Sequence, residues 1–239
     1  GIRKIARTFG RTATLTHSEK AAATFVVESN AERLASQLLE LEPNARSHAA
    51  QPFTIDLIDG ALLKTAGEVA AARSRHTARG KQPWFYTPDF SVRWSIGGMS
   101  CVEVKLEGHT GDDAYASKLE RARQVLGNHG IDFRVMVIPR YWCHPLRVNL
   151  PLLHQASKRK DLTPDDNVLA EVERLAASGA TTLRDYCPAF GMDMRMAPVM
   201  VAFGVLDVDV CNEHFNFDTP ARPAYGSLDH LSLLSRIAP

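Results

Sequence analysis

Two carboxylates and a lysine lie close together in the sequence YTPDFSVRWSIGGMSCVEVK, residues 86–105. Apolar and polar residues alternate before Gly97-Gly98, which supplies a turn, and an apolar run follows, so this stretch is predicted to form a β-hairpin. With the turn at residues 96–99, antiparallel pairing brings Asp89 within one or two residues of Glu103. Glu103 and Lys105 share a face of their strand because side chains alternate. This convergence predicts a metal site with a basic neighbour.

Such a group can hydrolyse a phosphodiester. That reaction needs a divalent ion that neutralises a phosphoryl oxygen and lowers the pKa of the attacking water. Hard oxygen ligands suit Mg²⁺ (or Mn²⁺), and Asp89, Glu103 and the backbone carbonyl of Val104 can supply them. Lys105, two residues after a ligand, can orient the water or stabilise the developing charge. Glu-x-Lys on a strand is frequent by chance, so the motif alone is weak evidence for such a site. The elements around it determine whether the prediction is supported.

A third carboxylate, Glu32, lies in the first turn of a predicted helix. Leucines recur at helical spacing in AERLASQLLELEP, residues 31–43, where Ser29 or Asn30 can cap the helix and Pro43 marks its end. In one interpretation this helix brings Glu32 to the acidic cluster. In the other, Glu32 is only a first-turn acid that stabilises the helix dipole.

The elements around the hairpin predict an α/β domain. Residues 52–58 alternate as a strand, residues 113–127 form an amphipathic helix, and residues 133–138 form a buried strand. Residues 59–83 are predicted to be long and irregular, with room for a short helix. Their basic side chains give two interpretations, contact with a phosphate backbone or a disordered insertion. The residues concerned are Arg75, Arg79 and Lys81.

Residues 1–20 are predicted to form a basic N-terminal arm. The arm is interpreted either as a contact to a DNA backbone or as a solvated tail. Its lysines are Lys4 and Lys20, and its arginines, which with Lys4 are the candidate DNA contacts, are Arg3, Arg7 and Arg11.

The second half of the chain is predicted to be a smaller, mostly helical domain. Residues 139–160, with several prolines, are interpreted as a connection between domains. Helices are expected at residues 167–177, 182–186 and 194–203, followed by the alternating strand VLDVDV. This order suggests a winged helix, a class also built simply for protein contact. The expected division is therefore an arm (1–20), an α/β domain (21–150) and a winged-helix-like domain (151–239).

Composition excludes several classes. A 239-residue chain with 45% hydrophobic residues is typical of a globular protein, and 28 basic against 27 acidic residues exclude a strongly basic nucleic-acid binder. Four dispersed cysteines without a CxxC pair argue against zinc and favour a cytoplasmic protein. No apolar run is long enough to cross a membrane. GxxxxGK[ST], GxSxG and HExxH motifs are absent from the sequence.

The chain resembles the PD-(D/E)xK nuclease superfamily and, within it, the TnsA-like transposon-end endonucleases. The resemblance is carried by IRKIART, VVESNAERLASQLLELEPNARSHAAQPFTI, YTPDFSV and CVEVK. It covers residues 2–149 well and the rest more weakly, through VMVAFGVLDVDVCN. It implies a restriction-endonuclease-like core, a central mixed sheet flanked by helices, over residues 21–150.

Residue by residue, the resemblance implies a catalytic site and its metal. It places the catalytic acid on Glu32, the second ligand on Asp89, the third on Glu103 and the lysine on Lys105. Gln51 matches the Gln-Pro entry to a strand and is a supporting residue. The third position is glutamine in the best-known member, but glutamate is an ordinary choice in the superfamily. The implied metal is Mg²⁺ (or Mn²⁺).

The resemblance also implies partners. A TnsA-like protein cuts double-stranded donor DNA at the 5′ ends of a mobile element while a DDE-type (TnsB-like) transposase subunit cuts and joins the 3′ ends. Contact with that subunit and with an ATP-dependent (TnsC-like) regulator is expected through the C-terminal half. The protein is then expected in the cytoplasm, at the nucleoid when bound to DNA.

Three other interpretations stay open. A restriction, repair or defence nuclease can have the same core. A non-catalytic DNA-binding or assembly protein can retain the fold. An α/β domain can carry these charges incidentally. Trp84, Phe85 and Tyr86 are able to stack on a base, although aromatic residues entering a strand more often belong to the core.

Overall fold

The computed structural model describes residues 14–109 and 111–238 and divides them into two compact units. The first unit contains residues 14–35, 44–138 and 238. The second contains residues 36–43 and 139–237. The expected boundary at residue 150 lies inside a helix of the second unit.

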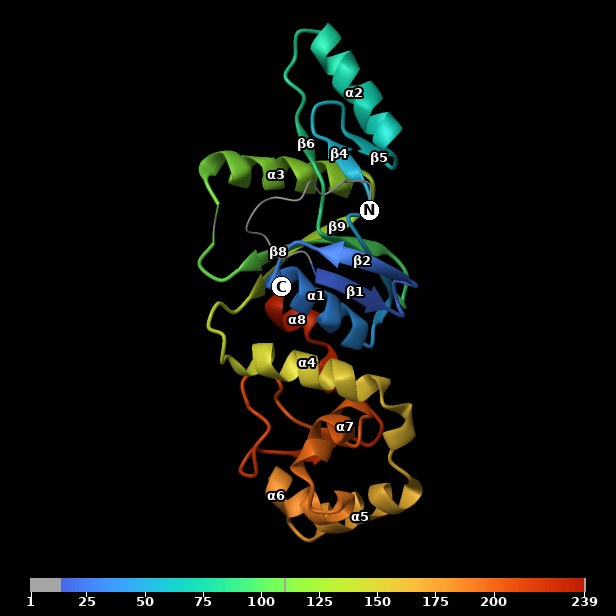
Figure 1. The fold of residues 1–239 in the computed structure, drawn as a ribbon, viewed down its shortest axis with the longest axis vertical. Helices are drawn as coiled ribbons and strands as arrows, with labels where there is room; N and C mark the ends of the chain where they lie inside the picture. Colours follow the sequence, from blue (N-terminus) through green and yellow to red (C-terminus); the bar gives the residue numbers. More distant parts are fainter. Residues whose placement is uncertain (1–13, 110, 239) are drawn as a thin grey trace. The chain divides into compact units, whose positions relative to one another are not determined.

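The first unit is built on a mixed four-stranded sheet of order β3-β7-β8-β9. β3 (Ala45–Ala50), β7 (Phe90–Trp94) and β8 (Met99–Leu106) are antiparallel neighbours, whereas β9 (Asp132–Ile138) joins β8 in parallel. The chain returns for this parallel pairing through α3 (Asp113–Asn128; Figure 1), as a crossover connection requires. An α/β fold with a mixed sheet flanked by helices is therefore confirmed.

The predicted hairpin is formed by β7 and β8. Phe90 pairs with Val102 and Arg93 pairs with Met99 across the antiparallel ladder. The turn contains Gly97 and Gly98 at φ +93° and +86°, a left-handed backbone that glycine adopts without strain. The hairpin and its turn are thus where the sequence predicts them.

Helix α3 covers the sheet because one of its faces is apolar. Ala122, Val125 and Leu126 recur at helical spacing and are buried. The helix begins after its cap Asp112, whose Oδ1 accepts a 2.8 Å hydrogen bond from the N–H of Tyr115. The core cluster that these residues join comprises Phe53, Ile55, Leu57, Tyr86, Cys101, Ala122, Val125, Leu126, Ile131 and Phe133.

Residues 59–83 are not irregular, so that prediction was wrong, but the helix expected within them is present. They contribute to a three-stranded sheet of order β5-β4-β6 and to a 13-residue helix, α2, next to β5 (Figure 1). A capping box between Thr65 and Glu68 starts the helix, so the T-x-x-E signature at residues 65–68 marked it in the sequence. The elements are β4 (Thr54–Asp56), β5 (Ala61–Leu63), α2 (Ala66–Ala78) and β6 (Phe85–Tyr86).

The N-terminal part of the described chain is a hairpin followed by a helix. β1 (Thr14–Ser18) and β2 (Ala23–Val27) pair antiparallel, so residues 14–18 are a strand and not part of a tail. α1 (Asn30–Leu41) follows them. Four basic residues of the predicted arm, Arg3, Lys4, Arg7 and Arg11, lie outside the described residues.

The second unit is mostly helical. The expected connection at residues 139–160 is largely a helix, α4 (Pro145–Lys158), because Pro145 occupies its first turn, where proline is favoured. VLDVDV yields only a two-residue strand, β10, paired with β11. The elements after α4 are η1 (Lys160–Leu162), α5 (Asp166–Ala177), α6 (Leu183–Tyr186), η2 (Cys187–Phe190), η3 (Met194–Met196), α7 (Ala197–Ala202), β10 (Leu206–Asp207), β11 (Arg222–Pro223), η4 (Asp229–Leu231) and α8 (Leu234–Ile237).

Among residues 14–109 and 111–238, no helix combines the length and the apolar character needed to span a membrane.

Candidate metal and catalytic site

Three neighbouring strands place Gln51, Asp89 and Glu103 side by side at one end of the four-stranded sheet. The β7–β8 register, continued by one residue, puts Asp89 opposite Glu103. The β3–β7 register, continued likewise, puts Gln51 opposite Asp89. The predicted proximity of Asp89 and Glu103 is therefore confirmed, and Gln51 joins them.

Asp89 is held by main-chain groups from both neighbouring strands. The N–H of Val104 donates to its Oδ2 at 2.7 Å. The N–H of Gln51 donates to its backbone carbonyl at 2.8 Å, from a residue at φ +45°, which is uncommon for a residue other than glycine. The observed contact of Val104 uses its N–H, and its carbonyl stays a predicted ligand.

Glu103 is buried, with 5% of its surface exposed, and both of its oxygens accept hydrogen bonds. The hydroxyl of Tyr86 donates to Oε2 and that of Tyr115 donates to Oε1. Lys105 Nζ lies 2.8 Å from the same Oε1 and donates to the Tyr115 hydroxyl at 2.5 Å. Burial and the charge of Glu103 raise the pKa of both tyrosines, so their hydroxyls stay protonated and remain donors.

The site carries more negative than positive charge. Burial and the carboxylate of Glu103, together with Glu32, raise the pKa of Asp89 to about 8. The N–H of Val104 and the ammonium of Lys105 act in the opposite direction but do not offset these effects. Three acidic side chains against one lysine, with oxygen ligands only, are a set whose full ionisation a divalent cation stabilises, so these residues fit Mg²⁺ or Mn²⁺.

Glu32 has the contacts of a helix-capping acid as well as an electrostatic effect on the site. Its carboxylate accepts from the N–H of Glu28 at 2.9 Å and from the hydroxyl of Ser29 at 2.8 Å. Ser29 Oγ in turn accepts from the N–H of Glu32 at 3.1 Å, which completes the capping arrangement of α1. Its charge nevertheless raises the pKa of Asp89, so both interpretations of Glu32 have an observation behind them.

The predicted DNA-contacting residues Arg75 and Arg79 belong to a different group of charges. Arg75 Nη2 lies 3.4 Å and Arg79 Nη1 3.6 Å from the carboxylate of Asp59. The two guanidinium groups stay about half exposed, at 46% and 56% of the side-chain surface. They can therefore still reach a polyanion, as can the exposed Lys81.

A second cluster that brings metal-ligating atoms together is formed by Asp56, Asp59 and His76. Their ligand atoms lie within 4.8 Å of one another, and His76 Nε2 is 2.7 Å from Asp56 Oδ2. Arg75 and Arg79 balance the two carboxylates, so the group has no excess negative charge. Because these arginines already compensate the carboxylates and His76 joins α2 to Asp56, we assign this cluster to the attachment of α2 rather than to a metal.

Tyr86 and Tyr115 are the site residues that sequence reasoning missed. Tyr86 was interpreted as a core aromatic; its ring does belong to the core, but its hydroxyl reaches Glu103. Tyr115 lies in the first turn of α3, ten residues after Lys105. Helix α3 begins shortly after β8 ends, so its first turn has to lie near the end of that strand. This short connection is the feature of the sequence that could have indicated Tyr115.

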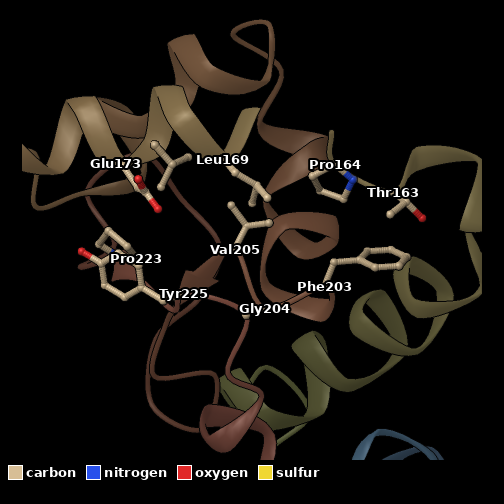
Figure 2. A pocket seen from close by; sticks show the side chains of 11 residues that line it. Thr163, Pro164, Leu169, Glu173, Phe203, Gly204, Val205, Pro223 and Tyr225 are labelled. Carbon is tan, nitrogen blue, oxygen red and sulfur yellow. The ribbon is translucent and has the colours of Figure 1, made fainter. Parts of the chain in front are cut away.

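A hollow of about 330 Å³ lies in the second unit, and none of the predicted site residues lines it. Its walls are largely apolar, and Figure 2 shows the rings of Phe203 and Tyr225 and the carboxylate of Glu173 around it. It brings no group of carboxylates together. The hollow therefore has no counterpart of the Asp89 and Glu103 arrangement of the first unit.

A scan of the chain against models of protein families gives no match, and a search among curated proteins gives no relative. The functional assignment consequently depends on the geometry of the site.

Proposed function

We propose that the protein is a Mg²⁺-dependent (or Mn²⁺-dependent) DNA endonuclease of the PD-(D/E)xK type. The observation that carries this proposal is the convergence of Asp89, Glu103 and Lys105 at one end of a mixed sheet, within the electrostatic reach of Glu32. When bound, the cation would supply charge neutralisation at a phosphoryl oxygen and a water of lowered pKa. Asp89, Glu103 and the carbonyl of Val104 would hold it.

The remaining residues have positioning and electrostatic roles. Lys105 orients the attacking water or stabilises the charge that develops on the phosphate. Gln51 fixes the main chain of Asp89 through its N–H. Glu32 adds negative charge at the site and thereby favours binding of a cation.

The order of elements supports the same proposal. Helix α1 precedes strands that include the β7–β8 hairpin, and α3 then leads to the parallel strand β9. Apart from α2, which lies between β5 and β6, this is the order of helix, strands, helix and strand predicted around the hairpin. A winged-helix-like role for the second unit is part of the proposal, since α5, α6 and α7 follow the expected order there.

The proposed substrate is double-stranded DNA at the ends of a mobile element. Arg75, Arg79 and Lys81 contact its phosphates, as do the basic residues of the N-terminal arm. A DDE-type (TnsB-like) transposase subunit and an ATP-dependent (TnsC-like) regulator are the proposed partners, bound through the C-terminal half. Both statements derive from the resemblance of the sequence to TnsA-like proteins.

Nicking of supercoiled plasmid DNA and of transposon-end DNA with Mg²⁺ or Mn²⁺ tests the activity. Asp89→Ala and Lys105→Ala should each reduce the rate at least about 100-fold while circular dichroism stays unchanged. The matched control is Asp161→Ala, which removes an exposed, ion-paired aspartate of the second unit and should not affect cleavage. Normal cleavage by Asp89→Ala or Lys105→Ala, with the transposase partner present, would contradict the proposal.

A pull-down with a candidate DDE-type transposase tests the partner. Co-purification and cleavage restricted to element ends support the transposon role. Cleavage without the transposase and without preference for such ends would assign the chain to a restriction, repair or defence nuclease instead.

A further inference from the structure

Oε1 of Glu103 interacts with two donors at once. The hydroxyl of Tyr115 donates to it, and Lys105 Nζ lies 2.8 Å away. Lys105 also donates to the Tyr115 hydroxyl and lies 4.0 Å from the centre of its ring. Tyr115 therefore holds the proposed metal ligand and the proposed catalytic lysine together.

The two tyrosines that bind Glu103 differ in how firmly they are held. Tyr86 is 6% exposed, belongs to β6 and is packed in the core cluster. Tyr115 is partly exposed and stands in the first turn of α3. Displacing Tyr86 requires the core to open, whereas Tyr115 needs only a change in its own side chain.

Gly111 allows Tyr115 to take this position. It has φ +72°, and a Cβ atom at Gly111 would lie 2.8 Å from Cδ1 of the Tyr115 ring. Real side chains do not approach so closely, so the ring would have to move. Gly108 has a similar φ of +76°, but a Cβ atom there meets nothing within 4 Å.

We propose that Tyr115 is a latch on this site, which competes with a divalent cation for Oε1 of Glu103 and releases Glu103 and Lys105 when the cation binds. The inference rests on the proposed function and adds its regulation. Tyr86 keeps its hydrogen bond to Oε2 throughout and positions the carboxylate.

Titration calorimetry of Mn²⁺ into the purified full chain measures this competition without relying on cleavage. Tyr115→Phe removes one hydrogen bond to a charged group and should tighten Mn²⁺ binding about tenfold. Gly111→Ala displaces the ring and should tighten binding in the same direction. Gly108→Ala imposes a similar backbone strain without touching the ring, and Tyr225→Phe removes an exposed hydroxyl of the second unit, so both should leave the affinity unchanged.

The possible failures are distinguishable. Equal or weaker Mn²⁺ binding by Tyr115→Phe, at a site that Asp89→Ala abolishes, would overturn the latch and leave the nuclease proposal standing. Mn²⁺ binding that Asp89→Ala leaves unchanged, or no binding by any of these proteins, would overturn the proposed metal site and the latch with it.

Discussion

Lys105 Nζ lies 2.8 Å from Oε1 of Glu103, and both side chains extend from the same face of β8 because they are two residues apart. Only 18% of the lysine side chain and 7% of the glutamate side chain are exposed, so this pair is shielded from solvent. Salt weakens a shielded pair of this kind much less than it weakens an exposed pair. The contacts of Asp89, Tyr86 and Tyr115 around it therefore decide how the site responds to substitution and pH.

The free energy of unfolding of Asp89→Asn should exceed that of the wild type by more at pH 8 than at pH 5. Below pH 3.8 Asp89 is protonated in both states; as pH rises from there to about 8 only the unfolded chain ionises it, so the wild type loses stability. Each pKa unit corresponds to about 1.4 kcal/mol, and we expect an advantage of at least about 2 kcal/mol for Asp89→Asn at pH 8. Urea unfolding at both pH values measures it. A pH-independent difference would contradict the raised pKa.

Glu32→Ala and Glu68→Ala separate the two interpretations of Glu32. Each glutamate closes a capping arrangement at the start of its helix, so each substitution should cost about 1 kcal/mol of unfolding free energy. Only Glu32→Ala should also weaken plasmid nicking, because Glu68 lies on α2 and has no effect on Asp89. Full activity of Glu32→Ala would leave Glu32 as a capping acid alone.

Tyr86→Phe should destabilise the protein more than Tyr186→Phe. The hydroxyl of Tyr86 donates to the carboxylate of buried Glu103, whereas that of Tyr186 donates to the backbone carbonyl of Ala180 at 3.0 Å. A hydrogen bond to a charged group contributes about 1.5–3 kcal/mol and a neutral one about 0.5–1.5 kcal/mol. Chemical denaturation at pH 7 gives both values. Equal costs would contradict a stronger hydrogen bond from Tyr86 to Glu103 than from Tyr186 to Ala180.

Asp56→Asn should destabilise the protein at pH 7 without changing its affinity for Mn²⁺. Burial acts to raise the pKa of Asp56, but hydrogen bonds from His76 and from the backbone N–H groups of Asp59 and Ile58 outweigh it and lower the pKa. The stability that Asp56 contributes is therefore present above pH 3.8 and is lost as pH falls through its lower folded value. We expect a cost of about 1–3 kcal/mol at pH 7. Weaker Mn²⁺ binding in this variant would identify the Asp56 cluster as a metal site.

The sequence predicted the structure correctly where the structure depends on residues close together in the sequence. The β7–β8 hairpin follows from period-two alternation and two adjacent glycines, and the register then brings Asp89 to Glu103. The core face of α3 follows from helical spacing in the same way.

The sequence was uninformative where tertiary contacts decide the outcome. Helix α2 buries little besides Ala72 and His76, so it has almost no apolar periodicity to detect. Helix α4 continues through Pro151, a residue that by itself argues for a break. The hydroxyls of Tyr86 and Tyr115 meet at Glu103 from separate elements, and no local pattern encodes that meeting.

The main-chain clamp on Asp89 determines which substitutions nearby the site can tolerate. The N–H groups of Gln51 and Val104 exist in every residue except proline, so the clamp itself does not depend on which side chains stand at these two positions. Proline at either position removes the donor, and at residue 51 it also cannot adopt φ +45°. Related proteins can thus differ widely in sequence around the aspartate and still present it at the same point of the sheet.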